Sequence, residues 1–355
     1  MKHNWRETVK IFFLFIVLLT VLAGCSSGSN ETETDDESQT NAPASDANDA
    51  TEYPIVIEHA FGKTEIESKP ERVVTIQWGN QDVALALGVV PVGFSEANFG
   101  VQDDSGILPW TSEKLDELGV TDPNVFQDTD GLDFEAISDA NPDVILAAYS
   151  GITQEDYDLL NKIAPVVAYP TSPWTTTWRE QVLYNAKGMG MEEEGEQLIK
   201  DVEETIAEKI KDYPEIEGKK VVWVNFSAKD TSQLHIYTPT DSRGAFLYEL
   251  GLEYPQSIMD MLEDSDSYSL KLSAENAGAL NDADIIVGYG NDELLEVLQD
   301  DPLLGEIPAI ERGSVAFIDS DTPLVAAGTP TPLSITYTID EYLELIGGAI
   351  EKLNE

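Results

Sequence analysis

The chain has 355 residues, of which 67 are Asp or Glu, 20 are Lys or Arg and one is Cys. This length suggests two domains, since a domain commonly holds about 100 to 200 residues. One cysteine cannot form an intramolecular disulfide or a cysteine-ligated zinc or iron–sulfur site. The formal charge of −47 repels the phosphate backbone, so we expect no nucleic-acid partner.

The N-terminus carries the features of an export signal. Basic residues precede an apolar run over residues 11–22, and small residues lead to Cys25. The run is shorter than the roughly 20 residues of a spanning helix, so residues 1–24 are predicted to be a signal peptide. The segment also resembles the bacterial lipoprotein box, which implies that Cys25 receives a lipid and anchors the chain on the outer face of the cytoplasmic membrane. A plain signal peptide with an incidental cysteine is the alternative.

A polar segment follows the signal. Residues 26–53 hold eight acidic and no basic side chains, and Tyr53 is their only large apolar residue. Such a segment cannot bury enough apolar surface to offset the entropy of ordering, so residues 25–53 are predicted to be a disordered acidic tether. Residues 24–28 match the G-x-S-x-G pattern of hydrolases, but that pattern requires a strand before it and a helix after it, so the match is discarded.

The remainder of the chain shows an α/β pattern that occurs twice. Short apolar runs at residues 73–76 and 221–224 fit strands that are buried on both faces, and helical spacing follows each of them. Residues 132–149 align with residues 272–289 at a constant offset of 140 residues. Both copies predict a helix, a turn and a buried strand that ends in Tyr. The fold class is therefore α/β, with two similar Rossmann-like lobes.

A helix is predicted to join the two lobes. Residues 178–213 lack strand signals, and apolar residues recur every four positions from Leu198 to Ile210, which places them on one stripe of a helix. We therefore predict one long interdomain helix over residues 178–213, between an N-terminal lobe at residues 54–177 and a C-terminal lobe at residues 214–355. Two bridged lobes leave a ligand cleft at the carboxyl ends of their strands.

Six motifs in order resemble the iron-siderophore and vitamin B12 class of ABC-transporter substrate-binding proteins. They occupy residues 72–76, 86–93, 134–146, 163–167, 272–275 and 301–310. The resemblance runs from about residue 55 to the C-terminus, and the segments 77–80 and 108–110 look most like the actinobacterial siderophore-binding branch. It implies two α/β lobes, a single stiff interdomain helix, and capture of a ferric siderophore for a membrane permease. Haem and cobalamin are the alternative ligands within this class.

The resemblance also assigns roles to two carboxylates. Members of this class dock one acidic residue on each lobe against arginines of the permease dimer, and the matching positions are Glu135 and Glu275. These two residues are also equivalent in the internal repeat, as a two-fold permease requires. The alternative is that each is a solvated glutamate, favoured by the positive end of a helix.

The ligand-binding candidates are aromatic side chains and arginines. A ferric siderophore brings its own oxygen donors to the iron, so the protein need supply only an aromatic bowl and a few donors or cations. The candidates lie after predicted strands or in nearby loops and turns: Trp78, Tyr149, Trp174, Trp178, Arg179, Arg243 and Tyr289. Packing in the core, or surface salt bridges for the arginines, is the alternative. A hydroxamate is favoured, because a chain poor in Arg and Lys suits a neutral or cationic complex better than a trianionic catecholate.

Other protein classes fit the sequence poorly. Beyond the signal peptide only His59 and His235 remain, and they lie in different halves, so we expect no metal site on the protein. Neither histidine lies in a catalytic motif and no Walker-type loop is present, so we expect no catalytic residues and no enzyme activity; a secreted hydrolase is the alternative. We also expect a monomer that needs no cofactor.

Overall fold

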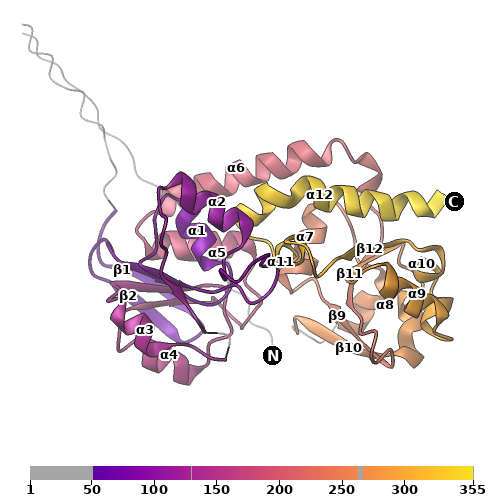
Figure 1. The fold of residues 1–355 in the computed structure, drawn as a ribbon, viewed down its shortest axis with the longest axis horizontal. Coiled ribbons are helices and arrows are strands. Elements are labelled where there is room, and N and C mark those ends of the chain that lie inside the picture. The colour runs from indigo at the N-terminus through magenta and orange to yellow at the C-terminus, as the bar shows by residue number, and fades with distance from the viewer. Residues whose placement is uncertain (1–50, 129, 263–266, 355) are drawn as a thin grey trace, which may run out of the picture. The chain divides into compact units, whose positions relative to one another are not determined.

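A computed structural model describes residues 51–128, 130–262 and 267–354 (Figure 1). The predicted signal peptide, Cys25 and the tether up to residue 50 lie outside the described residues. The last residues of the predicted tether belong to the packed structure, because the Thr51 hydroxyl donates to the Gly190 carbonyl at 3.1 Å and Tyr53 packs on a core. Within the described ranges, no helix has both the length and the apolar character needed to cross a lipid bilayer.

The N-terminal lobe contains a hairpin and a five-stranded sheet. Its strands are β1 (Ile55–His59), β2 (Gly62–Ile66), β3 (Val73–Thr75), β4 (Gly93–Ser95), β5 (Val125–Phe126), β6 (Val144–Ala147) and β7 (Val166–Ala168). Its first helices are α1 (Asn80–Ala86), α2 (Pro109–Glu117), α3 (Phe134–Asp139) and α4 (Gln154–Leu160). The strand order is β5-β4-β3-β6-β7, and all of these neighbours are parallel, whereas β1 and β2 pair antiparallel.

The inner strands of this sheet are buried on both faces. Val74 and Ile145 pack in a core with α3 and α4, whereas Val73 and Val144 pack in a second core with α1 and the β1–β2 hairpin. Successive side chains of a strand point to opposite faces, so a continuous apolar run needs cover on both sides. The prediction of doubly buried strands is confirmed here.

The C-terminal lobe has a mixed sheet. Its strands are β8 (Val221–Asn225), β9 (Gln233–Tyr237), β10 (Ser269–Ser273), β11 (Ile285–Tyr289) and β12 (Val315–Ile318). The order is β10-β9-β8-β11-β12, with β8, β11 and β12 parallel and β9 antiparallel to both of its neighbours. Residues 226–232 link β8 to β9 and are too few for a crossover helix, so β9 returns antiparallel.

Helices surround this second sheet. The α-helices are α7 (Ser242–Glu249), α8 (Gln256–Met259), α9 (Asp292–Asp300), α10 (Pro308–Arg312), α11 (Leu324–Ala327) and α12 (Pro332–Glu351). The 3₁₀ helices are η1 (Pro214–Ile216), η2 (Asp260–Leu262), η3 (Ala274–Leu280), η4 (Leu304–Glu306) and η5 (Lys352–Asn354). The repeat is visible in both lobes, because α3 leads to β6 beside the opening strand β3, and η3 leads to β11 beside the opening strand β8.

The connection between the lobes differs from the prediction of one continuous helix over residues 178–213. It consists of α5 (Trp178–Gly188) and α6 (Glu192–Ile210), with a turn at Gly190, whose φ of 69° lies in the left-handed region. A Cβ at residue 190 would lie 2.3 Å from the Tyr53 hydroxyl. Glycine at this position therefore allows both the left-handed φ and the close approach of Tyr53. The long interdomain helix is therefore α6, which runs beside α12 (Figure 1).

Candidate functional site

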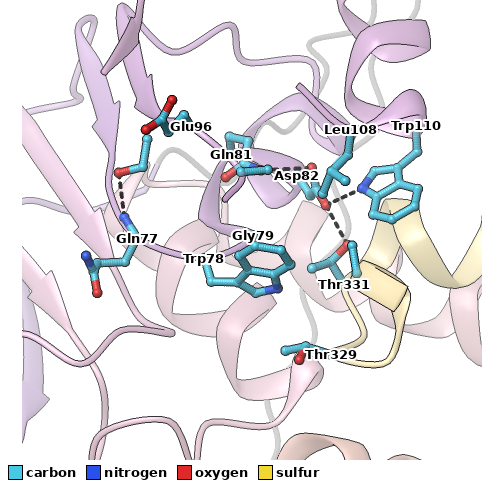
Figure 2. A pocket seen from close by; sticks show the side chains of 13 residues that line it. Gln77, Trp78, Gly79, Gln81, Asp82, Glu96, Leu108, Trp110, Thr329 and Thr331 are labelled. Atoms are coloured by element: carbon cyan, nitrogen blue, oxygen red, sulfur yellow. Dashed lines mark hydrogen bonds between the residues drawn. The ribbon is translucent and has the colours of Figure 1, made fainter. Parts of the chain in front are cut away.

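A pocket lies where the turn after β3 meets the segment before α12 (Figure 2). Residues from both lobes line it, among them Trp78, Asp82, Glu96, Trp110, Thr329 and Thr331. Gly79 has a φ of 69°, and a Cβ at this position would lie 2.5 Å from the Thr331 methyl carbon. Glycine at residue 79 therefore allows the two lobes to approach closely beside the pocket.

Trp78, a predicted ligand residue just past the first strand, lines this pocket. The Gln181 amide donates to the Trp78 carbonyl at 3.0 Å and fixes the turn. The Phe99 ring stacks on Trp78, with 4.2 Å between ring centroids and 6° between planes. Phe99 is 38% exposed in the loop after β4, and sequence reasoning missed it because no periodic pattern marks that loop.

Asp82 joins the two lobes beside the pocket. Its Oδ2 accepts from Trp110 Nε1 at 2.9 Å and from Thr331 Oγ1 at 2.6 Å (Figure 2). Its Oδ1 accepts from Thr111 Oγ1 at 2.7 Å. Burial raises the pKa of Asp82 to about 6, although these hydrogen bonds act in the opposite direction. Because Thr331 also caps α12, the carboxylate fixes the start of that helix against the N-terminal lobe.

Arg243 and Tyr289, both predicted ligand contacts, lie together in the C-terminal lobe. Arg243 Nη1 donates to both carboxylate oxygens of Asp241 at 2.9 Å, and Nε donates to the Tyr289 hydroxyl at 3.2 Å. The guanidinium carbon lies 4.1 Å from the centroid of the Tyr237 ring. Burial raises the pKa of Asp241, and the adjacent guanidinium opposes that shift. Sequence reasoning missed Tyr237, although it ends a strand and so carried the same signal as Tyr289.

Tyr149 and Trp174 bring the N-terminal lobe to this cluster. The Tyr149 hydroxyl lies 3.2 Å from the Ser242 hydroxyl of the C-terminal lobe and shares a hydrogen bond with it. The Tyr149 ring meets Trp174 edge-on, with 5.4 Å between centroids. Burial raises the pKa of Tyr149, so its hydroxyl remains protonated and can donate. Both predicted residues therefore lie at the junction of the lobes.

The cluster lies beside the pocket. A Cβ on Gly328 would lie 3.0 Å from the Tyr289 hydroxyl, and the next residue, Thr329, lines the pocket. On the N-terminal side, the Gly151 amide beside Trp174 approaches Oε1 of the pocket residue Gln77 at 3.5 Å. We use the name interlobe cleft for the pocket of Figure 2 together with this cluster of Tyr149, Trp174, Tyr237, Arg243 and Tyr289.

Two predicted ligand residues lie elsewhere. Trp178 is 2% exposed, and its Nε1 donates to Glu249 Oε2 at 2.9 Å. Arg179 pairs with Glu203 at 2.6 Å and with Glu249 at 2.5 Å. These contacts hold α5 against α6 and α7, so the prediction of ligand contacts at both residues is corrected. The sequence held a signal for this, because Thr177 and Glu180 have the spacing of a capping box and mark residue 178 as the start of a helix.

The two docking candidates are exposed on equivalent elements. Glu135 lies in the first turn of α3 and Glu275 in the first turn of η3. Their role in docking stays a prediction. Over the described part of the chain, no group of three or more His, Cys, Asp and Glu side chains is placed to hold a metal ion.

Comparison with known proteins gives consistent matches. The model of the periplasmic binding protein family matches residues 73–322. The crystal structure of PiaA from Streptococcus pneumoniae TIGR4 in complex with ferrichrome is 55% identical, covers 84% of this chain and 99% of that chain, and has a TM-score of 0.81. Staphylococcus aureus SirA complexed with staphyloferrin B is 28% identical over 84% of this chain and 98% of that chain, with a TM-score of 0.62. The probable siderophore-binding lipoprotein YfiY of Bacillus subtilis is 24% identical over 79% of this chain and 78% of its own length.

Proposed function

We propose that this chain, which belongs to the periplasmic binding protein family, captures a ferric hydroxamate siderophore and delivers it to an ABC permease. The observation that carries the ligand class is the interlobe cleft, which is rich in aromatic side chains and, among the described residues, contains one guanidinium, that of Arg243, paired with Asp241. Three hydroxamate groups fill the coordination sphere of Fe³⁺ and leave the complex without net charge, so the protein need offer apolar faces and a few hydrogen-bond donors.

The similarity to PiaA supports the same ligand class. That protein was solved with ferrichrome, and it shares 55% of its residues with this chain over 84% of the length. In our proposal, Trp78 and Trp174 supply apolar faces, and Tyr149, Tyr289 and Arg243 supply donors to the oxygens of the complex. Trp178 and Arg179 have no part in it.

Delivery requires attachment to the membrane and a surface that docks on the permease. We infer that a lipid on Cys25 holds the chain at the outer face of the cytoplasmic membrane, and that Glu135 and Glu275 contact the permease. What supports the docking role is that both glutamates are exposed at the first turns of elements that the internal repeat makes equivalent. Two equivalent contacts match a permease with two-fold symmetry.

The test is a titration of the mature chain, followed by the quenching of intrinsic tryptophan fluorescence. The ligands are ferrichrome, ferrioxamine B, ferric citrate, a ferric catecholate, haemin and cobalamin, with iron-free ferrichrome as the control. We expect saturable sub-micromolar quenching by the ferric hydroxamates, because Trp78 and Trp174 line the cleft. Saturation by haemin or cobalamin alone would reject the hydroxamate proposal.

A further inference from the structure

The positive charge of Arg243 in the interlobe cleft is neutralised within the protein. Arg243 Nη1 donates to both oxygens of Asp241 at 2.9 Å, and the Arg243 backbone amide donates to Asp241 Oδ1 at 2.9 Å. The Asp241 side chain is only 1% exposed, whereas that of Arg243 is 15% exposed. The carboxylate is therefore behind the arginine, and a ligand in the cleft can reach only the guanidinium.

Other groups hold the guanidinium in place. Its Nε donates to the Tyr289 hydroxyl at 3.2 Å, and its flat face lies over the Tyr237 ring at 4.1 Å. The Nη2 nitrogen is the one that these contacts leave for a ligand. Arg243 is thus built to offer a hydrogen bond to an uncharged oxygen, and its positive charge is already paired.

The opposite side of the cleft is acidic. Asp82 and Glu96 line the pocket of Figure 2, and among the described residues lining that pocket there is no Lys or Arg. With the charge of Arg243 paired to Asp241, the described residues of the cleft hold no further Lys or Arg, and Asp82 adds a carboxylate. An anion moved from water into such a site loses its hydration and finds no unpaired cation, so its binding is disfavoured.

We propose that Asp241 is a specificity-determining residue, which cancels the charge of Arg243 and so restricts the cleft to neutral and cationic ferric complexes. This inference rests on the proposed function, since it assumes that the cleft binds ferric siderophores. The inference goes beyond the proposed function, because it names the residue that excludes ferric citrate and ferric catecholates, whose complexes are anionic.

The test compares Asp241→Asn with the wild-type chain. Asn caps a helix as well as Asp does, so the substitution removes the charge and keeps the hydrogen bond to the Arg243 amide. We expect the affinity for ferric citrate, relative to that for cationic ferrioxamine B, to rise by about tenfold or more, as removal of a nearby like charge should produce. The control is Asp230→Asn, an exposed Asp that accepts from the Ser232 amide, and its selectivity should equal that of the wild type.

Each outcome bears on one proposal. If the wild-type chain binds no ferric complex, the proposed function fails. If it binds ferrichrome but Asp241→Asn has unchanged selectivity, or if the wild-type chain binds ferric citrate as tightly as ferrichrome, only the role of Asp241 fails. Circular dichroism checks the fold of the variant, and Asp241→Ser, which also retains a capping oxygen, replaces it if the Asn form does not fold.

Discussion

Asn80 and Tyr149 are joined through both backbone polar groups of the tyrosine. Asn80 Nδ2 donates to the Tyr149 carbonyl at 2.9 Å, and the Tyr149 amide donates to Asn80 Oδ1 at 3.2 Å. Asn80 Nδ2 also donates to the Ile76 carbonyl at 2.8 Å, and Asn80 Oδ1 also accepts from Asn185 Nδ2 at 2.9 Å. One buried side chain thus ties the turn that carries Trp78 to the loop that carries Tyr149.

Removal of this amide should loosen the N-terminal wall of the interlobe cleft. We expect Asn80→Ala to lower the free energy of unfolding by about 3 kcal/mol, because several buried backbone groups lose their partner. Ferrichrome affinity should fall with it, since the Trp78 turn is no longer fixed. Urea unfolding and fluorescence titration measure the two effects. Asn276→Ala, which removes an exposed amide bonded to Ser273, is the control and should change stability by less than about 0.5 kcal/mol.

Substitution of Arg179 tests whether this residue stabilises the fold or contacts the ligand. Its ion pairs to Glu203 and Glu249 connect α5 with α6 and α7, outside the interlobe cleft. We expect Arg179→Gln to lower the free energy of unfolding by about 1 kcal/mol, since these pairs are partly solvated. Ferrichrome affinity should stay the same within error, whereas Arg243→Gln should weaken it. A large loss of affinity at normal stability in Arg179→Gln would restore the original assignment.

The sequence predicted positions that depend on local patterns better than positions that depend on contacts between distant segments. The 140-residue repeat placed Tyr149 just past β6 and Tyr289 at the end of β11, because these positions depend only on where a strand ends. Trp178 was misplaced because its partner Glu249 lies 71 residues away, on a helix whose direction no local pattern reports. Phe99 was missed for a similar reason, since its stacking on Trp78 depends on the path of an irregular loop.

Phe99 should contribute to ligand capture, although it lies in a loop. Its ring covers a face of Trp78, and without it that face becomes hydrated and the wall of the cleft becomes less rigid. We expect Phe99→Ala to weaken ferrichrome binding by about tenfold. This factor corresponds to the upper end of the interaction energy of an aromatic pair. The matched control is Leu159→Ala on α4, because Leu159 is also 38% exposed. Equal or tighter binding by Phe99→Ala would contradict this role.

Asp82 predicts a dependence of stability on pH. Burial raises its pKa from 3.8 to about 6 in the folded protein, so ionisation opposes folding. The protonated carboxyl therefore contributes about 3 kcal/mol to the free energy of unfolding. This contribution is fully present below pH 3.8 and is lost as the pH rises through about 6. Asp82→Asn does not titrate, and its amide can still accept from Trp110 and Thr331. Urea unfolding at both ends of this range should therefore show a smaller loss of stability with rising pH in the variant than in the wild type, and equal losses would refute the assignment.

Substitution of Glu135 and Glu275 should affect uptake of the ligand but not its binding. Both are exposed, and neither lies in the interlobe cleft, so the double substitution to Arg should leave ferrichrome affinity unchanged. Uptake of ferrichrome-bound iron, in cells that depend on this chain, should be abolished because like charges then face the permease arginines. The control is the same double substitution at Glu155 and Glu293, which are exposed in the first turns of α4 and α9. Equal loss of uptake in the two double variants would show that acidity of the surface, and not these two positions, supports docking.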